Sequence, residues 1–281
     1  LDPSNVTGQQ MLARLQSLGA RIPADSLQSS VTHWEAALAA NPENQDSRIV
    51  LSQLYVTAGN LPSAIDALRP VVDSRPDFRL AFAQLLQQAD RADEAAAFLQ
   101  SLCDESLAAI AQESSDDSAA AVYAEALLLR GQYREARSFL AARKESASGG
   151  DTRSDQSKLD SVYGRVCLAE FDQLTDFSPS KFDQNVALQY EIPESVNPAT
   201  LLELLHESLK CNATTMSAID RLAFLSFSKH AAAKESERLI RQLRLEGDFG
   251  AEVLNKLGMF GLLLKKYETA RAYLEQANAR S

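Results

Sequence analysis

The feature that most constrains this chain is a unit that recurs along it: an apolar helical stretch, a short break, and a second stretch that begins with Ala-x-x-x-Leu. The clearest copy spans residues 45–78. Two of its apolar residues lie one helical turn apart, a Gly-Asn pair then interrupts the helix, and a proline closes the second stretch. The residues that carry the pattern are, in order, Leu51, Tyr55, Gly59, Asn60, Ala64, Leu68 and Pro76. This order predicts two antiparallel helices joined by a tight turn.

The same signature returns three times downstream, each time with a break about five positions before the alanine. These copies centre on Ala95, Ala136 and Ala270, and each alanine is followed four residues later by a leucine. Weaker copies are Ser30-x-x-x-Trp34, Leu201-x-x-x-Leu205 and Glu235-x-x-x-Leu239. A helix pair of this size cannot bury its apolar face alone, so neighbouring pairs must stack on it. The spacing therefore predicts an all-α chain of about seven stacked helix pairs.

The unit at 45–78 resembles the tetratricopeptide repeat, whose 34-residue pattern places Leu, a small residue, Tyr, Ala, an aromatic and Pro in this order. Leu51, Ser52, Tyr55 and Ala64 occupy pattern positions, while Arg48 stands where the family has Trp. The small residue allows two helices to approach closely, and the proline ends the second helix. The resemblance implies an α-α superhelix, a right-handed solenoid of antiparallel helix pairs.

Two departures from the repeat predict the domain organisation. Residues 146–157 are polar and contain a Gly-Gly pair, which is typical of a flexible linker. We expect three to four helix pairs within 1–145 and further pairs within 158–281, interrupted by a long insertion at about 175–197. That insertion is too apolar for an inert loop, so it either packs back onto the repeats or adapts the surface for a partner.

Composition argues against several functional classes. The net charge of −10 is unfavourable for general nucleic-acid binding, which depends on clustered Lys and Arg. No apolar run approaches the roughly 18 residues that span a bilayer, so we expect a soluble segment, either cytoplasmic or periplasmic, without direct membrane insertion. The opening Leu1-Asp2-Pro3 looks like the end of a repeat, which suggests a piece of a larger protein.

The residue types that carry chemistry are scattered. His33, His206 and His230 lie on separate helical stretches, without a spacing that presents two metal ligands on one face. The three cysteines are far apart in apolar stretches, which predicts buried thiols. Phosphate-binding loops and nucleophile motifs are absent from the sequence. We therefore expect no cofactor, no metal site and no catalytic group.

The resemblance also implies where a partner binds, because the first helix of each pair lines the concave groove in this family. By register, the candidate groove residues are Gln53, Val56, Gln84, Gln87, Glu125, Leu128, Arg165, Phe224, Phe227, Asn255 and Met259. One subtype of the family holds a peptide's terminal carboxylate with Lys, Asn and Arg from adjacent first helices. Here Ile49, Gln53, Leu80 and Gln84 stand at the corresponding places, which argues against that ligand. Gln, Phe and Met suit an extended or helical segment held by side-chain contacts.

These observations favour a protein-interaction scaffold or adaptor of a bacterial kind, which binds a partner protein or peptide in the groove. An alternative is a regulatory domain that binds a small ligand, with the 175–197 insertion as its lid. A third class, an enzyme, requires distant carboxylates or histidines to meet in one cleft.

Overall fold

A computed structural model of the chain describes residues 24–112, 117–146, 153–178, 192–211, 214–228, 230–246, 251–263 and 265–280. Within these ranges the secondary structure consists of α-helices and two short 3₁₀ helices, with no β-strand. This confirms the all-α prediction. The chain divides into two compact units, Leu1–Gln112 and Glu113–Ser281.

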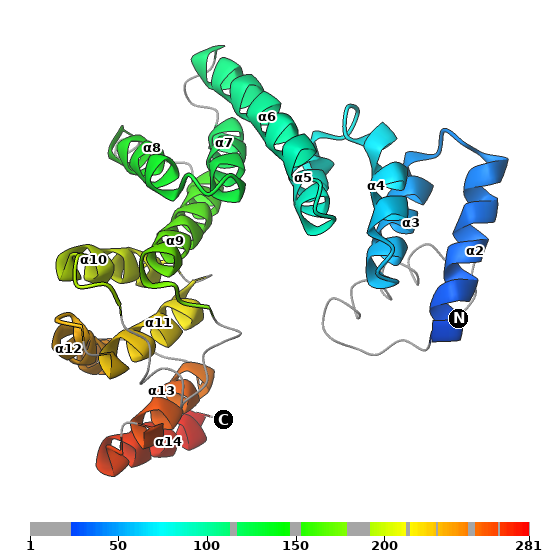
Figure 1. The fold of residues 1–281 in the computed structure, drawn as a ribbon. Helices are drawn as coiled ribbons and strands as arrows, with labels where there is room; N and C mark the ends of the chain where they lie inside the picture. The colour runs from blue at the N-terminus through cyan, green and yellow to red at the C-terminus, as the bar shows by residue number, and fades with distance from the viewer. Residues whose placement is uncertain are drawn as a thin grey trace. The chain divides into compact units, whose positions relative to one another are not determined.

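Over residues 24–112, the described part of the first unit, helix α2 is followed by two helix pairs, which can be traced in Figure 1. Its helices are α2 (Ala24–Ala40), α3 (Gln45–Thr57), α4 (Leu61–Leu68), η1 (Arg69–Val71), η2 (Pro76–Phe78), α5 (Arg79–Gln88) and α6 (Ala92–Gln112). Helix α3 packs against α4 and α5 against α6, while α2 covers α3 and α4 contacts α5. Two apolar clusters fill the space between them, one around Trp34 and Leu51 and the other around Ile65 and Phe82.

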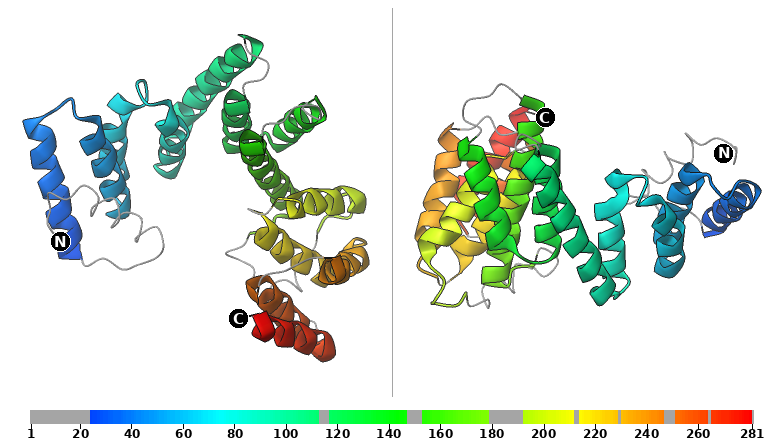
Figure 2. Two further views of the ribbon diagram at one scale, coloured as in Figure 1. Left: turned by 180° about the vertical axis from the view of Figure 1, so that it is seen from behind. Right: turned by 90° about the horizontal axis from the view of Figure 1, so that it is seen from above.

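The described segments of the second unit form four helix pairs. Its helices are α7 (Asp117–Leu129), α8 (Tyr133–Ser146), α9 (Arg153–Thr175), α10 (Pro198–Leu209), α11 (Thr215–Phe227), α12 (Ala233–Glu246), α13 (Ala251–Leu263) and α14 (Tyr267–Arg280). We call the earlier helix of each pair the first helix and the later one the second helix. Within this unit α8, α10 and α12 lie on one side of the first helices α9 and α11 in both the front and back views (Figures 1 and 2). First helices also contact one another directly, α7 with α9 and α11 with α13.

Small residues stand where the helices of a pair cross. Ser52 and Ala64 are both buried, and the Ser52 hydroxyl donates to the Ala64 carbonyl across the crossing at 2.9 Å. The same place is taken on α5 and α7 by Ala83 and Ala124, both fully buried. Bulky side chains here would separate the helices, because interhelical distance depends on the residues at the contact. The small residues in the sequence pattern therefore mark the positions where the two helices of a pair approach each other closely.

Four of the breaks between paired helices share one backbone geometry. Helices α3, α5, α7 and α13 are each followed by a residue with positive φ, at Gly59, Asp90, Gly131 and Lys265. In each case the next backbone N–H donates to the carbonyl five residues earlier, for example Asn60 to Tyr55 at 2.8 Å. This is the Schellman helix ending, which needs one left-handed residue. It explains why each break lies five residues before the alanine of the second helix.

The turn between α11 and α12 differs and corrects the predicted register there. Five residues separate these helices, whereas three separate α3 from α4. Ser236, not Glu235, is fully buried at the crossing, and its hydroxyl donates to the Leu222 carbonyl at 2.7 Å. His230 organises the longer turn, because one ring nitrogen bonds the Val196 carbonyl and the other accepts from Ala232 N. The repeat in α12 therefore starts one residue later than the sequence pattern suggested.

The compact units divide at Gln112 and Glu113, not at the predicted linker 146–157. Helices α8 and α9, on either side of residues 147–152, pack against each other. Lys144 pairs with Asp160 at 2.8 Å, and Arg137 pairs with the buried Glu170 at 2.7 Å. Both helices thus belong to the second unit, although the linker sequence is polar.

We expect the left-handed position to tolerate glycine better than any other residue. Gly59→Ala should lower the free energy of unfolding by about 1–2 kcal/mol, because φ is +75° there although a Cβ would meet nothing within 4 Å. Lys265→Gly, at φ 55°, should raise it by up to about 1 kcal/mol. Urea unfolding of both variants tests this, and changes of the same sign would contradict it.

The close crossing at Gly164 gives a second expectation for stability. A Cβ at Gly164 would overlap the Thr214 hydroxyl oxygen and lie 3.2 Å from Cys211 Cβ. Thr214 is buried and its hydroxyl is bonded to the Ser208 carbonyl at 2.6 Å, so it cannot easily move away. Gly164→Ala should therefore destabilise the protein by about 1–2 kcal/mol despite the better helix propensity of Ala. A higher melting temperature would refute this explanation.

Candidate functional site

Several of the candidate residues directly follow a small crossing residue of a first helix. Because successive helical residues are rotated by about 100°, the residue after a buried crossing residue points to another face. Gln53 follows Ser52, Gln84 follows Ala83 and Met259 follows Gly258, and all three of these following residues are exposed. We call the surface that such residues form on the first helices the first-helix face.

In the first unit this face is uncharged. Gln53 and Val56 on α3 are exposed, with Val56 at 40%, and Gln84 and Gln87 on α5 are exposed as well. The structure therefore brings the four candidates of this unit to the surfaces of two neighbouring pairs. Amide groups both donate and accept hydrogen bonds, so this part of the face suits a polar, uncharged ligand.

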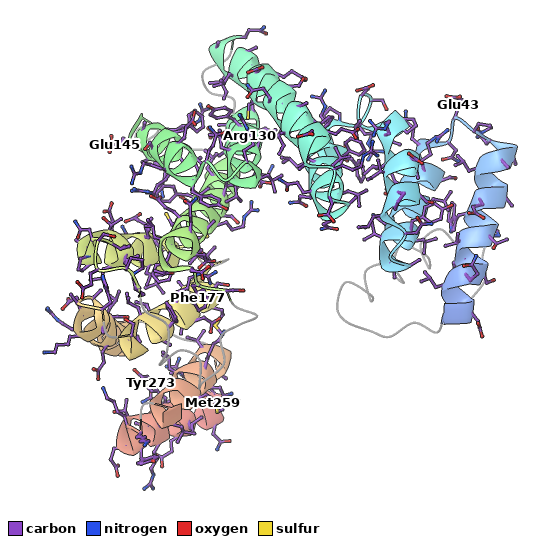
Figure 3. The ribbon with its side chains drawn as sticks, in the orientation of Figure 1. Glu43, Arg130, Glu145, Phe177, Met259 and Tyr273 are labelled. Atoms are coloured by element: carbon purple, nitrogen blue, oxygen red, sulfur yellow. The ribbon has the colours of Figure 1, made fainter. Side chains whose placement is uncertain are left out.

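In the second unit the face is charged where α7 meets α9. Glu125 and Arg165, both named as candidates from the sequence, form an ion pair with each other. Leu128, one turn further along α7, is half-buried. On α13, Asn255 is exposed, and Met259, which Figure 3 labels, is 51% exposed.

Phe224 requires a correction. Its side chain is only 2% exposed and its ring lies 4.9 Å from the ring of Phe177, centroid to centroid. A ring buried in this way cannot contact a partner, so Phe224 is withdrawn from the first-helix face. The side chain of Phe227, the neighbouring candidate on α11, lies outside the described residues.

The side chain that covers Phe224 is Phe177, which lies at the start of the predicted insertion. Helix α9 ends at Thr175, Asp176 adopts a φ of 52°, and the Phe177 N–H donates to the Asp172 carbonyl. This helix ending turns the chain back, and Phe177 is buried against α11. At the far end of the insertion Ile192 is also buried. The two described ends therefore pack onto the repeats, while residues 179–191, most of the proposed lid, lie outside the described residues.

A series of ion pairs joins consecutive first helices in the second unit, and the sequence analysis missed it. Besides Glu125 and Arg165, Asp172 on α9 binds Arg221 on α11 through two contacts of 2.7 and 2.5 Å. Asp220 on α11 then binds Lys256 on α13 at 2.7 Å. Each acid lies on the earlier helix and each base on the later one. Partners 36 to 49 residues apart leave no local sequence signal.

The ion pair between Asp172 and Arg221 is largely buried, and this burial affects the pKa of the Asp172 carboxyl. The Arg221 side chain is 7% exposed and the Asp172 side chain 25% exposed. Burial raises the pKa of the Asp172 carboxyl, although the hydrogen bonds from Arg221 oppose this effect. Arg221 also donates to the Ser217 carbonyl at 2.8 Å and lies over the Phe177 ring. The guanidinium is thus held by three different groups in one place.

The described residues provide little for catalysis or metal binding. No group of three or more His, Cys, Asp or Glu side chains that could hold a metal occurs among them. Cys103, Cys167 and Cys211 are buried, which confirms the prediction for the thiols, and burial raises the pKa of Cys167 to about 12. Among the helices that the structure describes, none is long and apolar enough to cross a membrane.

Loss of the Asp172 carboxylate should destabilise the folded protein, because the buried Arg221 guanidinium depends on it for an ion pair. We expect Asp172→Ala to lower the free energy of unfolding by about 3 kcal/mol, because Arg221 is left without its counter-charge. Glu275→Ala is the matched control, since Glu275 pairs with Arg271 on the surface of α14. The Glu275 side chain is 64% exposed and the Arg271 side chain 74% exposed. It should change stability by less than about 0.5 kcal/mol in the same urea titration. Equal effects of the two substitutions would contradict a structural role for the buried pair.

Comparison with a family model agrees with the helix pairs of the first unit. The family model described as tetratricopeptide repeat matches residues 25–77 and 49–107, from α2 to α6. Among solved structures, the chain is similar to a tetratricopeptide repeat protein from Parabacteroides merdae ATCC 43184, with a TM-score of 0.44 and 10% identity over 98% of this chain and 93% of that one. Among curated proteins, none matches the chain. The matched family model identifies residues 25–107, which lie in the first unit, as tetratricopeptide repeats, and small crossing residues recur on α7 and α13 of the second unit.

Proposed function

We propose that this chain is a protein-interaction module that binds a partner polypeptide on its first-helix face. Tetratricopeptide repeats generally mediate protein–protein interaction, and the proteins that contain them are generally non-catalytic scaffolds. The observation that supports the proposal is the difference in burial between neighbouring positions of the first helices. The crossing residues Ser52 and Ala83 are buried, whereas the adjacent Gln53 and Gln84 are exposed on successive helix pairs.

The chemistry of this face supports a protein ligand. Gln53 and Gln84 offer amide groups that match the donors and acceptors of a peptide backbone, and Val56 adds an apolar contact. Because these side chains are neutral, the affinity should depend little on ionic strength, in contrast to a nucleic-acid complex. Glu125 and Arg165 neutralise each other in the second unit and thus add no excess positive charge.

The proposal is tested by affinity capture from native lysate with the chain and two matched double variants. Gln53→Arg with Gln84→Arg alters the first-helix face, whereas Gln28→Arg with Gln100→Arg adds the same charge at exposed positions of α2 and α6. Circular dichroism first establishes that both variants fold.

We expect the first variant to retain about fivefold to tenfold less of each specific partner, which corresponds to about 1–1.4 kcal/mol, and the control to retain the parent amount. The reason is that a charged, longer side chain replaces a neutral amide at the contact. Partners that are lost equally from both variants, or from neither, would refute binding through the first-helix face.

A further inference from the structure

Helix α11 already carries an aromatic side chain from another part of the chain, and this contact has three components. Phe177 lies in a non-helical stretch after α9, and its ring contacts the Phe224 ring at 4.9 Å. The guanidinium carbon of Arg221 lies 4.9 Å from the same Phe177 ring, in a cation–π arrangement. Asp172 on the preceding first helix fixes the guanidinium. We call Arg221 and Phe224 the α11 aromatic site.

Helix α13 repeats these components at the same spacing. In the α11 aromatic site, the cation Arg221 lies two positions before the crossing residue Ala223, and the apolar residue Phe224 lies one position after it. Around the crossing residue Gly258, α13 has Lys256 and Met259 at those two places. Lys256 is fixed by Asp220 on the preceding first helix at 2.7 Å, as Arg221 is fixed by Asp172. The identity of Gly258 as a crossing residue follows from its contacts, since an added Cβ would lie 2.6 Å from Leu274 Cγ on α14.

The two sites differ in what covers them. Phe224 is 2% exposed beneath Phe177, whereas Met259 is 51% exposed. Leu262, one turn beyond Met259 on α13, is 40% exposed. Asn255, Met259 and Leu262 are spaced i, i+4, i+7 and thus share one stripe of the helix. We call Lys256, Met259 and Leu262 the α13 aromatic site (Figure 3 labels Phe177 and Met259).

The geometry points to the α13 aromatic site as the binding site for an aromatic side chain that a partner polypeptide presents from an extended segment. Its occupant is of the same chemistry as Phe177, because Phe177 is the side chain that lies on the corresponding cation and apolar residue of α11. The inference deepens the function proposed above and rests on it, since Met259 belongs to the first-helix face.

The groups of the α13 aromatic site favour an aromatic ring over an aliphatic side chain. Methionine sulfur makes favourable contacts with ring edges, and its flexible chain adapts to the ligand. Lys256 offers an ammonium group to the ring face while Asp220 holds it in place, with side-chain exposures of 31% and 24%. An aliphatic ligand would gain only the apolar contact with Met259 and Leu262. The site should therefore discriminate between Phe and Leu.

Methyl NMR tests this directly, because the chain contains only three methionines. The protein is labelled with [methyl-¹³C]methionine, and the Met259 signal is assigned with Met259→Leu. The probe is the capped peptide acetyl-Thr-Asp-Phe-Ser-amide, which copies residues 175–178, and its match is acetyl-Thr-Asp-Leu-Ser-amide. We expect the Phe peptide to produce a saturable upfield ring-current shift of the Met259 methyl, and the Leu peptide to bind several-fold more weakly.

Substitution of the cation provides a second readout. Lys256→Gln should weaken the Phe peptide about twofold to fivefold, Lys256→Arg should retain its affinity, and Lys210→Gln on the surface should have no effect. A Met259 signal that does not respond, or that responds equally to both peptides, overturns the proposal. A signal that depends on protein concentration together with dimers in sedimentation also overturns it, because a second copy then covers the site.

The two proposals fail in distinguishable ways. If the Phe peptide shifts Met259 while the Gln53→Arg, Gln84→Arg variant captures the same partners as its control, the aromatic site stands and binding through the face of the first unit fails. If capture depends on those glutamines and Met259 does not respond, the module stands and the aromatic site fails.

Discussion

The close crossing of paired helices at small residues is the constraint on which the rest of this structure depends. The Ser52 hydroxyl ties α3 to α4 through the Ala64 carbonyl, and the Ser208 hydroxyl of α10 bonds the Gly164 carbonyl of α9 at 3.3 Å, where a Cβ on Gly164 would overlap Thr214. Because the turns before α4, α6, α8 and α14 have a defined Schellman geometry, the alanine of these second helices arrives at the crossing at a constant offset. The residue after the crossing residue must then point to a different face. The exposed positions of the first helices are thus a consequence of the packing and are free to vary in chemistry.

The two units use this freedom differently. In the first unit the exposed residues beside the crossings are glutamines, whereas in the second unit acid–base pairs join successive first helices. The pairs are partly buried, and each one fixes a cation beside a crossing residue or on the first-helix face. At α11 the fixed cation and an apolar neighbour hold Phe177 from the same chain. A structural interaction within the protein therefore resembles the contact that we propose for a partner at α13.

Several sequence inferences succeeded because they depended on local geometry. A break five residues before an alanine is a local property of the backbone, and the positive φ at Gly59, Asp90 and Lys265 confirms it. The register of α12 was wrong because the turn before it contains extra residues held by His230, whose partner Val196 lies 34 positions away. The division of the chain was placed at 146–157 because that stretch is polar, but Lys144 and Asp160 pair across it.

By itself, the sequence determined the all-α class, the antiparallel helix pairs, the buried thiols and the tetratricopeptide resemblance. These properties follow from helical periodicity, small residues and turn residues, which act within about 34 residues. The tertiary structure alone decided that Phe224 is covered by Phe177 while Met259 is open, and which acids and bases meet on the first helices. The physical reason is that burial and ion pairing depend on contacts between residues far apart in the chain, and no local pattern records them.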